Sequence, residues 1–455
     1  MTSKIWHPNS WQSKSCLQNI TYADPKALLH VMSILEKLPP LVTPVEIKNL
    51  KKQLADATLN KGFVLQAGDC AESFSDCHSD SITSKLKILL QMSLILLHGL
   101  RKPIIRIGRI AGQYAKPRSA DTETQDNITL PCYRGDVINK PEFTLEARTP
   151  NPDLMLQGYQ YSALTLNYLR ALIDSGFASL EHPENWNLDF VQHSPLANEY
   201  QAFTRSLGDT LDFINTVEGL RTSSINRVDF FTSHESLHLL YEQALTRQTD
   251  PNHWYNLSAH FLWVGMRTAD VNSAHIEYLR GISNPIGVKV GPKATPEWLI
   301  ELIDILNPNN EPGRLTFITR MGATQIEKCL PSLIEAVQAH GKHVLWLCDP
   351  MHGNTQVTEQ NIKTRHFSDI LCELEKTFQI HHQLNSHLGG VHLELTGENV
   401  TECLGGARGL AEKDLTRAYK SLVDPRLNYE QSLEIAMLIV RQIGAAAPHK
   451  SNPKD

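Results

Sequence analysis

The stretch Phe63-Val64-Leu65-Gln66-Ala67-Gly68-Asp69-Cys70 is an apolar run that ends in charged and metal-binding side chains, and the 455-residue chain repeats this arrangement eight times. The eight runs begin at Phe63, Pro103, Val228, His260, Ile286, Leu315, Val344 and Val391. Just past or near their downstream ends the runs carry Cys70, Arg109, Glu235, Arg267, Lys289, Arg320, His352 and Glu394. Short runs rich in Val, Ile and Phe that alternate with helix-length stretches are typical of a parallel sheet. Eight of them predict an α/β fold, a closed (β/α)8 TIM barrel, with its active site at the C-terminal ends of the strands.

The chain is longer than the roughly 250 residues of a plain barrel, so it must carry additions. We place these additions in an N-terminal extension over residues 1–60 and in a loop and helical insertion over residues 110–226, after the second strand. The insertion holds two helix-like segments, Tyr159 to Ile173 and Glu199 to Val217. Neither contains a Gly/Ser/Pro-rich linker of the kind that separates domains. The sequence therefore predicts a single decorated barrel domain over residues 1–455.

Two helix boundaries are marked clearly. Thr295-Pro296-Glu297 offers an N-cap, a first-turn proline and an early carboxylate ahead of the apolar stretch Leu299 to Leu306. Asn428 with Gln431 resembles a capping box before the last helix, and Gly444 is the expected end of that helix.

Composition narrows the class of protein. A formal net charge of -6 argues against a general nucleic-acid-binding surface, which needs a basic stripe. The most apolar stretch, Leu86 to Leu100, is interrupted by polar side chains and is shorter than a membrane span, so we expect a barrel helix there. Met1 to Asn9 lacks the apolar core of a secretory signal. The eight cysteines include no CxxC pair. These features predict a cytoplasmic enzyme with reduced cysteines and with neither nucleic-acid nor membrane partners.

Four side chains form a candidate metal site. Cys70 and His352 come just after predicted strands, Glu394 lies at the end of another, and Asp424 lies on a loop after the last strand. One sulfur, one nitrogen and two carboxylates suit manganese, iron, cobalt or zinc, whereas calcium does not favour a thiolate. The alternative for Cys70 is the commoner one for a lone cysteine after a strand, a small buried apolar residue.

A set of basic residues points to an anionic substrate. Arg109, Arg267, Lys289 and Arg320 come from four different strands, so no helix-surface pattern explains them. Arginine binds carboxylate and phosphate through two parallel hydrogen bonds, and the loop Lys116-Pro117-Arg118-Ser119 adds a second anion-binding candidate. The alternative is that each basic residue pairs with an internal Asp or Glu, which explains one residue more readily than the whole set.

Several motifs together resemble the type II 3-deoxy-D-arabino-heptulosonate 7-phosphate (DAHP) synthases. The resemblance runs in order from about Ser10 to Arg441, and it is most specific in the block from Gly389 to Gly406. The other motifs that carry it are Gly68-Asp69-Cys70-Ala71-Glu72-Ser73-Phe74, Gly108-Arg109-Ile110-Ala111-Gly112-Gln113, Lys116-Pro117-Arg118-Ser119, Tyr133-Arg134-Gly135-Asp136, Asn284-Pro285-Ile286-Gly287-Val288-Lys289-Val290-Gly291-Pro292, Ile318-Thr319-Arg320-Met321-Gly322 and Asp349-Pro350-Met351-His352-Gly353-Asn354-Thr355.

The resemblance implies a reaction and assigns roles to residues. Members of the family condense phosphoenolpyruvate with erythrose 4-phosphate and release phosphate, at the entry to the shikimate pathway of aromatic amino acid biosynthesis. The implied metal ligands are Cys70, His352, Glu394 and Asp424, with Mn2+ the expected ion and Co2+, Fe2+ or Zn2+ as alternatives. The implied phosphoenolpyruvate site comprises Arg109, Met266, Arg267, Lys289 and Arg320. The implied erythrose 4-phosphate contacts are Arg118 and Ser119, and the implied catalytic residues are Lys116 and Lys289.

One departure from the family pattern bears on activity. In Leu262-Trp263-Val264-Gly265-Met266-Arg267-Thr268 the family usually has glutamate where this chain has Met266. That glutamate is expected beside phosphoenolpyruvate, where with the strand lysine it helps to place the attacking water. We therefore expect weakened but real catalysis. Two alternatives stay open: a catalytically degenerate relative that acts as a regulatory or partner subunit, and a synthase that uses a five-carbon aldose phosphate.

The additions to the barrel suggest assembly and control. Type II relatives use the N-terminal segment and the insertion for oligomer contacts, which implies a homodimer or homotetramer, and some bind aromatic amino-acid effectors. Trp6 and Trp11 are either anchors for such an interface or ordinary packing residues. His392 shares a strand face with Glu394, and we expect a neighbouring partner rather than a fifth metal ligand. His234 and Glu235 are expected to support the site through hydrogen bonds.

Overall fold

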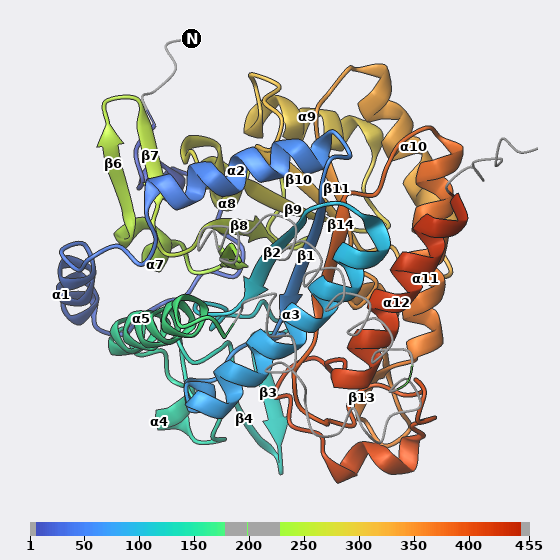
Figure 1. Cartoon of the computed structure of the whole chain (residues 1–455). Coiled ribbons are helices and arrows are strands. Elements are labelled where there is room, and N and C mark those ends of the chain that lie inside the picture. Colours follow the sequence, from blue (N-terminus) through green and yellow to red (C-terminus); the bar gives the residue numbers. More distant parts are fainter. Residues whose placement is uncertain (1–5, 178–197, 199–227, 447–455) are drawn as a thin grey trace, which may run out of the picture.

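A closed barrel of eight parallel strands forms the centre of the molecule (Figure 1). The computed structural model describes residues 6–177, Asn198 and residues 228–446. The barrel order is β1-β14-β11-β10-β9-β8-β5-β2, and β1 pairs with both β2 and β14 to close it. Each predicted run overlaps one barrel strand, which confirms the predicted fold class. The strands are β1 (Phe63–Gly68), β2 (Ile104–Arg109), β5 (Phe230–Glu235), β8 (Phe261–Val264), β9 (Ile286–Val290), β10 (Leu315–Thr319), β11 (Leu345–Cys348) and β14 (Gly390–Glu394).

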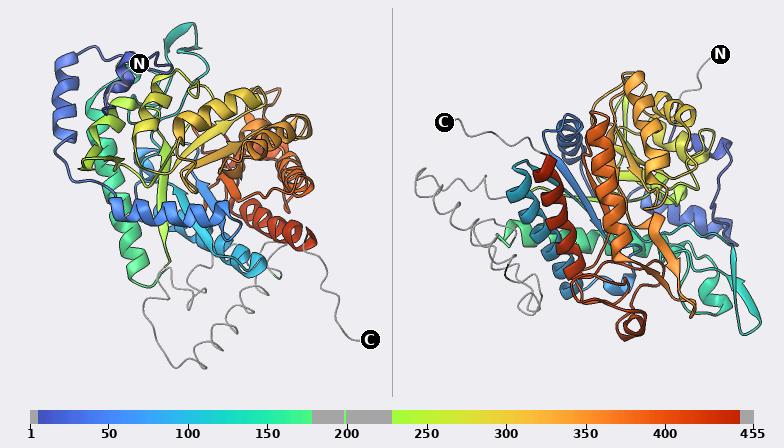
Figure 2. Two further views of the ribbon diagram at one scale, coloured as in Figure 1. Left: turned by 90° about the horizontal axis from the view of Figure 1, so that it is seen from above. Right: turned by 90° about the vertical axis from the view of Figure 1, so that its right-hand side faces the viewer.

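Helices surround the barrel (Figure 2), and the first two described α-helices, α1 and α2, come before β1 in the sequence. The α-helices are α1 (Pro25–Leu35), α2 (Pro44–Thr58), α3 (Ser79–Leu100), α4 (Leu145–Arg148), α5 (Asp153–Asp174), α7 (Leu239–Ala244), α8 (Ala274–Gly281), α9 (Pro296–Leu306), α10 (Ile326–Ala339), α11 (Phe367–Gln383) and α12 (Tyr429–Ala446). The 3-10 helices are η1 (Ser10–Ser13), η2 (Phe74–Asp76), η5 (His352–Asn354) and η6 (Glu412–Arg417). None of the helices in the described part of the chain has the length and hydropathy that crossing a membrane requires.

In the residues that the structure describes, three two-stranded antiparallel sheets lie outside the barrel. They are formed by β3 (Thr122–Gln125) with β4 (Ile128–Pro131), β6 (Thr246–Asp250) with β7 (His253–Asn256), and β12 (Thr355–Val357) with β13 (Lys363–Arg365). The first of them lies within the predicted insertion, ahead of α5. That helix covers the predicted segment Tyr159 to Ile173, whereas the predicted helix Glu199 to Val217 lies outside the described residues.

Helix α2 covers the N-terminal end of the barrel. Its Leu50 and Leu54 are buried in one cluster with strand residues that include Val64 at the start of β1. This packing explains the amphipathic pattern of the helix, because each buried side chain removes apolar surface from water. Thr43 caps the helix, and Glu46 completes a capping box. With this end covered, the cavity described below lies at the C-terminal ends of the strands.

The predicted helix boundaries are largely confirmed. The Thr295 side chain accepts a hydrogen bond from the Trp298 backbone N–H at the start of α9. The Asn428 N–H donates to Gln431 Oε1 (3.2 Å), and the Gln431 N–H donates to Asn428 Oδ1 (3.0 Å). The predicted end at Gly444 is wrong, since α12 continues to Ala446. Alanine is the best helix former, and the two alanines after the glycine extend the helix past it.

Trp6 and Trp11 pack against their own chain. The Trp6 indole N–H donates to the Glu277 carbonyl of α8 (2.9 Å), and its ring lies edge-on to Trp254 with the centroids 6.0 Å apart. Trp11 is buried and donates to Gln243 Oε1 of α7 (3.0 Å). Of the two predictions for these residues, the packing role is the one the structure bears out.

Candidate active site

A cavity of about 540 Å3 opens at the C-terminal ends of the barrel strands. All but two of the twelve residues predicted for the site line it. The exceptions are Cys70 and Glu394, which are completely buried and contact Lys116 from below. The residues of the predicted set that line the cavity are Arg109, Lys116, Arg118, Ser119, Met266, Arg267, Lys289, Arg320, His352 and Asp424.

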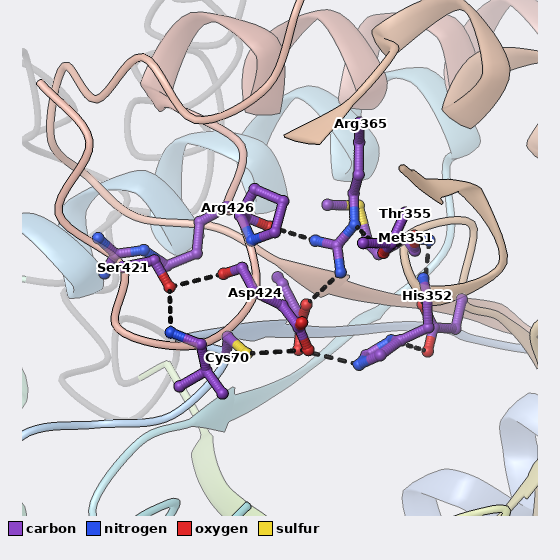
Figure 3. Close-up of polar contacts among 12 residues, drawn as sticks. Cys70, Met351, His352, Thr355, Arg365, Ser421, Asp424 and Arg426 are labelled. Atoms are coloured by element: carbon purple, nitrogen blue, oxygen red, sulfur yellow. Dashed lines mark hydrogen bonds and ion pairs between the residues drawn. The ribbon is translucent and has the colours of Figure 1, made fainter. Parts of the chain in front are cut away.

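Three of the four predicted metal ligands form a compact group. One ligand atom each from Cys70, Glu394 and Asp424 lies within 4.8 Å of the other two. Cys70 and Asp424 face each other with His352 nearby (Figure 3), and His352 Nε2 lies 3.1 Å from Glu394 Oε1. Because a thiol, an imidazole and two carboxylates suit a divalent transition ion, the donor set fits the metal that the sequence predicts.

Asp349 orients His352 toward this group. Asp349 Oδ1 accepts the backbone N–H of His352 (3.2 Å), and Oδ2 lies 2.7 Å from His352 Nδ1. A carboxylate partner at Nδ1 favours the tautomer whose Nε2 carries a free lone pair. The His352 nitrogen nearest Glu394 is therefore the one prepared to bind a metal.

The loop that carries Asp424 is held by a buried ion-pair network. Arg426 Nη1 donates to Asp69 Oδ1 (2.8 Å), and Nη2 donates to Glu402 Oε1 (2.9 Å). The Ser421 hydroxyl donates to the Asp424 carbonyl (2.6 Å; Figure 3). These contacts join the loop to the residues that follow β1, so Asp424 is fixed relative to Cys70.

Cationic side chains balance the carboxylates. The Lys116 ammonium lies 2.7 Å from Cys70 Sγ, 3.3 Å from Glu394 Oε1 and 2.9 Å from Asp424 Oδ2. Buried Arg365 donates to Glu394 Oε2 (2.8 Å), and Lys363 lies 3.1 Å from Asp424. Burial alone would raise the pKa of the Glu394 carboxyl, but the cations around it hold that pKa well below its usual range. Burial raises the pKa of the Cys70 thiol, and Glu394 adds to the rise.

A second group of cations lines the cavity wall. Lys289 contacts Asp349, Arg320 Nη2 donates to the His352 carbonyl (3.0 Å), and exposed Arg267 donates to Ser119 Oγ (2.8 Å). Burial lowers the pKa of Lys289 to about 8, although Asp349 works against the shift. The buried Arg320 Nε has no hydrogen-bond partner among the described residues, so it remains available to an anion.

Two buried glutamates set the loops that carry these residues. Glu72 accepts hydrogen bonds from three successive backbone N–H groups, residues 111–113, ahead of Lys116. Glu373 accepts from the Met321 and Gly322 N–H groups (2.7 and 2.9 Å) and from Asn354 Nδ2 (2.7 Å). These contacts fix the loops that follow β2, β10 and β11. Arg109, Arg320 and His352 lie at the end of these strands or in these loops.

The chain matches a known protein family over nearly its whole length. Residues 6–440 match the class-II DAHP synthetase family. The chain belongs to the class-II DAHP synthetases. It is 48% identical over 451 residues to a Neurospora crassa protein named phospho-2-dehydro-3-deoxyheptonate aldolase. This alignment covers 95% of this chain and 93% of that protein. It is 45% identical to a Streptomyces coelicolor protein of the same name, over 95% of this chain and 96% of that protein. A third relative, phospho-2-dehydro-3-deoxyheptonate aldolase AroG of Mycolicibacterium smegmatis, is 44% identical over 92% of this chain and 91% of that protein.

In the cavity wall of this DAHP synthetase, Arg109 is held by buried neighbours. Its Nε donates to the Asp69 carbonyl (2.8 Å), its Nη2 donates to Glu394 Oε1 (3.0 Å), and its Nη1 contacts His392 Nε2. Since arginine only donates, His392 Nε2 must accept, and His392 Nδ1 then donates to Gln66 Oε1 (2.8 Å). The predicted role of His392 as a neighbouring partner is therefore confirmed.

Met266 and Glu235 occupy adjacent parts of the cavity wall. The Met266 side chain is 41% exposed and lies over Gly291, where any side chain would meet its sulfur. Glu235 lines the cavity beside Gly265, and no described residue forms a hydrogen bond with its buried Oε1. Glu235 is thus one of the residues that line the cavity, and the supporting role predicted for it stays a prediction. His234 pairs with Glu242 (2.8 Å), and its ring lies against Gly112, so its predicted support of the site stays a prediction.

Several side chains of the DAHP synthetase site escaped prediction. Asp349 directly follows a strand within a motif that the sequence makes conspicuous, so its position alone could have identified it. Arg365 and Lys363 lie on β13, a short strand outside the barrel without an apolar run. The sequence contains no periodic pattern that would place them beside Glu394 and Asp424.

Proposed function

We propose that the chain catalyses the metal-dependent condensation of phosphoenolpyruvate with erythrose 4-phosphate, giving DAHP and inorganic phosphate at the first step of the shikimate pathway. The observation that carries this proposal is the convergence of cations from several strands on a cavity whose floor holds a thiol and two carboxylates. Such a cavity suits small, highly charged substrates better than neutral ones. The names of the relatives support the same reaction.

The basic side chains divide between the two substrates. Lys289, Arg320 and Arg267 bind the phosphate of phosphoenolpyruvate, and the free Nε of Arg320 supplies a donor that no described protein atom uses. Arg109 and Lys116 lie toward its carboxylate. Arg118 and Ser119 bind the phosphate of the aldose, and the Arg267–Ser119 hydrogen bond joins the two subsites (2.8 Å). Fixed cations of this kind align two anions that would otherwise repel each other.

The chemistry joins C3 of phosphoenolpyruvate to the aldehyde carbon of erythrose 4-phosphate. A bound divalent ion supplies Lewis-acid polarisation of the aldehyde. Water then adds at C2, and the C2–O bond to phosphate breaks as inorganic phosphate leaves. The two protons of the water end on the former aldehyde oxygen, which becomes a hydroxyl, and on the departing phosphate. Glu235 is suited to hold that water and accept its proton. Of the three carboxylates that line the cavity, Glu123 and Asp424 already have ion-pair partners, whereas Glu235 Oε1 is unpaired. Lys289 lies on the same wall with its pKa lowered to about 8, so it can donate or accept a proton near neutral pH.

Cys70, Glu394, Asp424 and His352 are the proposed metal ligands, with Mn2+ as the preferred ion. Two carboxylates together with imidazole and thiolate accommodate Mn2+ as well as Fe2+, Co2+ or Zn2+. Asp349 and Arg365 serve as the partners that orient His352 and Glu394.

The decisive experiment follows both substrates and the phosphate product. Chelator-treated protein receives phosphoenolpyruvate and erythrose 4-phosphate before and after addition of Mn2+. We expect metal-dependent consumption of both substrates with stoichiometric phosphate release. Binding of Mn2+ and phosphoenolpyruvate without turnover would instead identify a regulatory or partner subunit. A clear preference for a five-carbon aldose phosphate in the same assay would overturn the assignment of the acceptor.

We also propose a reduced, cytoplasmic setting and a homodimeric or homotetrameric assembly. All eight cysteines are free thiols, as expected where glutathione and thioredoxin keep proteins reduced. Light scattering on the purified protein tests the assembly directly, and a monomer at micromolar concentration would contradict it.

A further inference from the structure

A second cavity, of about 440 Å3, lies at the end of the barrel opposite the active site. We call it the basal cavity. It is bounded by Phe63 at the start of β1, Leu388 shortly before β14, and residues of α3, α11 and α12, helices that pack side by side (Figure 2). The lengths of β1 and β14 put roughly 20 Å between this cavity and Cys70 or Glu394 at their far ends. The two cavities are therefore separate, and their volumes are both typical of small-molecule sites.

The walls of the basal cavity are largely apolar. Phe63, Leu100, Phe378, Leu388 and Ile443 supply the apolar surface. Among the described residues that line this cavity, none is acidic, whereas one lysine and three histidines are present. A lysine without an acidic residue beside it favours an apolar molecule that carries a negative charge over one that carries a positive charge.

His381 provides a polar group without a partner in the wall of the basal cavity. Its side chain is 1% exposed, and Nδ1 lies 2.9 Å from the Ser386 hydroxyl. Within the described part of the chain, the buried Nε2 has no hydrogen-bond partner. Burial lowers the pKa of His381 to about 3, so the ring is neutral and contributes a hydrogen bond rather than a charge. His381 therefore lines the cavity without adding a charge to its wall.

Lys102 supplies the positive charge. Its ammonium donates to Asn60 Oδ1 (2.6 Å), and both residues line the basal cavity. His387 Nε2 lies 3.2 Å from the Ala57 carbonyl, which can only accept, so this nitrogen carries hydrogen. Lys102 thus presents a charged donor, whereas the His387 N–H is already donated to the Ala57 carbonyl. Neither side chain has a carboxylate partner in the structure described.

We propose that the basal cavity binds a small apolar monocarboxylate, with its apolar body between Phe63, Phe378 and Leu388 and its carboxylate at Lys102. A free amino acid fits less well, because its ammonium would find no acidic side chain among the described lining residues. The ligand class therefore consists of aryl or branched alkyl carboxylates without an amino group.

The test uses 3-phenylpropionate as the probe and the full-length protein as the receptor. Isothermal titration in the presence of saturating phosphoenolpyruvate and Mn2+ keeps the active site occupied. We expect one molecule bound per chain with a dissociation constant of about 1 mM, typical for a ligand of this size. The neutral 3-phenylpropionamide and zwitterionic phenylalanine should bind at least about five-fold more weakly, since each lacks a matched charge.

Two variants locate the probe. Lys102→Met keeps the stem and removes the charge, and should weaken 3-phenylpropionate about five-fold. Gln442→Trp fills the cavity from α12 and should abolish binding, whereas Arg441→Trp, at a neighbouring position that does not line it, should leave binding unchanged. Melting temperatures confirm that each variant folds. Three results with the occupied active site would overturn the proposal: no binding at about 10 mM probe, equal binding of the amide, or unchanged binding in Gln442→Trp. A probe that binds without phosphoenolpyruvate but not with it would also overturn the proposal, because it would then bind in the active site.

Discussion

Lys116 lies where its ammonium and a divalent ion would share the same ligand atoms. It contacts Cys70 Sγ, Glu394 Oε1 and Asp424 Oδ2 at 2.7 to 3.3 Å. A metal ion must compete with this internal cation for the carboxylate oxygens. We predict that Lys116→Met binds Mn2+ about ten-fold more tightly or better, which corresponds to about 1.4 kcal/mol.

Titration calorimetry on chelator-treated protein measures this affinity. Lys363→Met is the matched control, because Lys363 contacts only Asp424 among the proposed ligands and its side chain is 44% exposed. We expect a gain of no more than about two-fold there, since exposed ion pairs contribute little. Weaker Mn2+ binding in Lys116→Met would show that the lysine helps to hold the ion rather than competing with it.

Met266 lines the active-site cavity at a position where the resemblance to the family predicts a glutamate. If the missing carboxylate places the attacking water, Met266→Glu should raise kcat by a factor on the order of 10². Met266→Gln has a similar volume but no charge, and it should leave kcat within about two-fold of the parent. Steady-state rates of phosphate release separate the two variants. An unchanged kcat in Met266→Glu would count against water placement and would leave Glu235, with its unpaired Oε1, as the carboxylate that serves this step.

Lys289 gives the site a pH dependence. Burial lowers its pKa from 10.5 to about 8. Below pH 8 the ammonium is present and binds phosphate, so kcat/KM for phosphoenolpyruvate should fall by up to about ten-fold per unit above pH 8. Between pH 8 and 10.5 the unfolded chain holds this proton and the folded chain does not, so the group makes stability rise with pH in that window. Lys289→Met should lose both dependences, as pH profiles of rate and of urea midpoint would show. A parent profile flat to pH 10 would refute the assignment.

At the scale of secondary structure, the start of α12 links the last helix to the site. The Asn428 amide accepts from the Gln431 N–H (3.0 Å) and donates to the Val400 carbonyl (3.1 Å), and Gln431 Nε2 donates to the Cys403 carbonyl (3.1 Å). We predict that Asn428→Ala lowers the free energy of unfolding by about 2 kcal/mol, near the upper end for an N-cap, because a buried carbonyl also loses its donor. Asn428→Asp keeps the cap but not the donor and should lose about half as much, as denaturant midpoints would reveal. Equal losses would mean that the cap contributes little.

The sequence predicts barrel strands well and the added hairpins poorly, for a physical reason. Strands β9 and β10 are buried on both faces and read as continuous apolar runs, which mark them directly. Strand β3 is largely exposed, so neither apolar runs nor alternation mark it. The same limit applies to the site. A residue that directly follows a barrel strand, such as Arg320, can be predicted as a site residue from its position in the sequence. Arg365 lies on a hairpin whose position depends on tertiary packing, so its sequence position does not reveal its role.

At the scale of the whole molecule, the proposed metal ligands join the first and last parts of the barrel. Cys70 follows β1, Glu394 ends β14, and Asp424 lies 354 residues along the chain from Cys70. A ligand that binds only the folded state stabilises it by mass action, so Mn2+ at 100 times its dissociation constant should add about 2.7 kcal/mol to the free energy of unfolding. In a chain of this length, that gain should raise the melting temperature by a few degrees.

The cysteines offer a matched pair of variants to locate this stabilisation. Cys70→Ser weakens a proposed ligand and should remove most of the Mn2+-induced rise in melting temperature. Cys348→Ser changes an equally buried thiol, whose neighbour at 3.4 Å is the Thr377 hydroxyl, and should retain the rise even if its starting stability is lower. Differential scanning calorimetry with and without Mn2+ makes the comparison within each variant, so their differing baseline stabilities cancel. If Mn2+ still raised the melting temperature of Cys70→Ser, the ion would bind elsewhere. The proposed ligands would then not stabilise the junction between the first and last barrel strands by binding the metal.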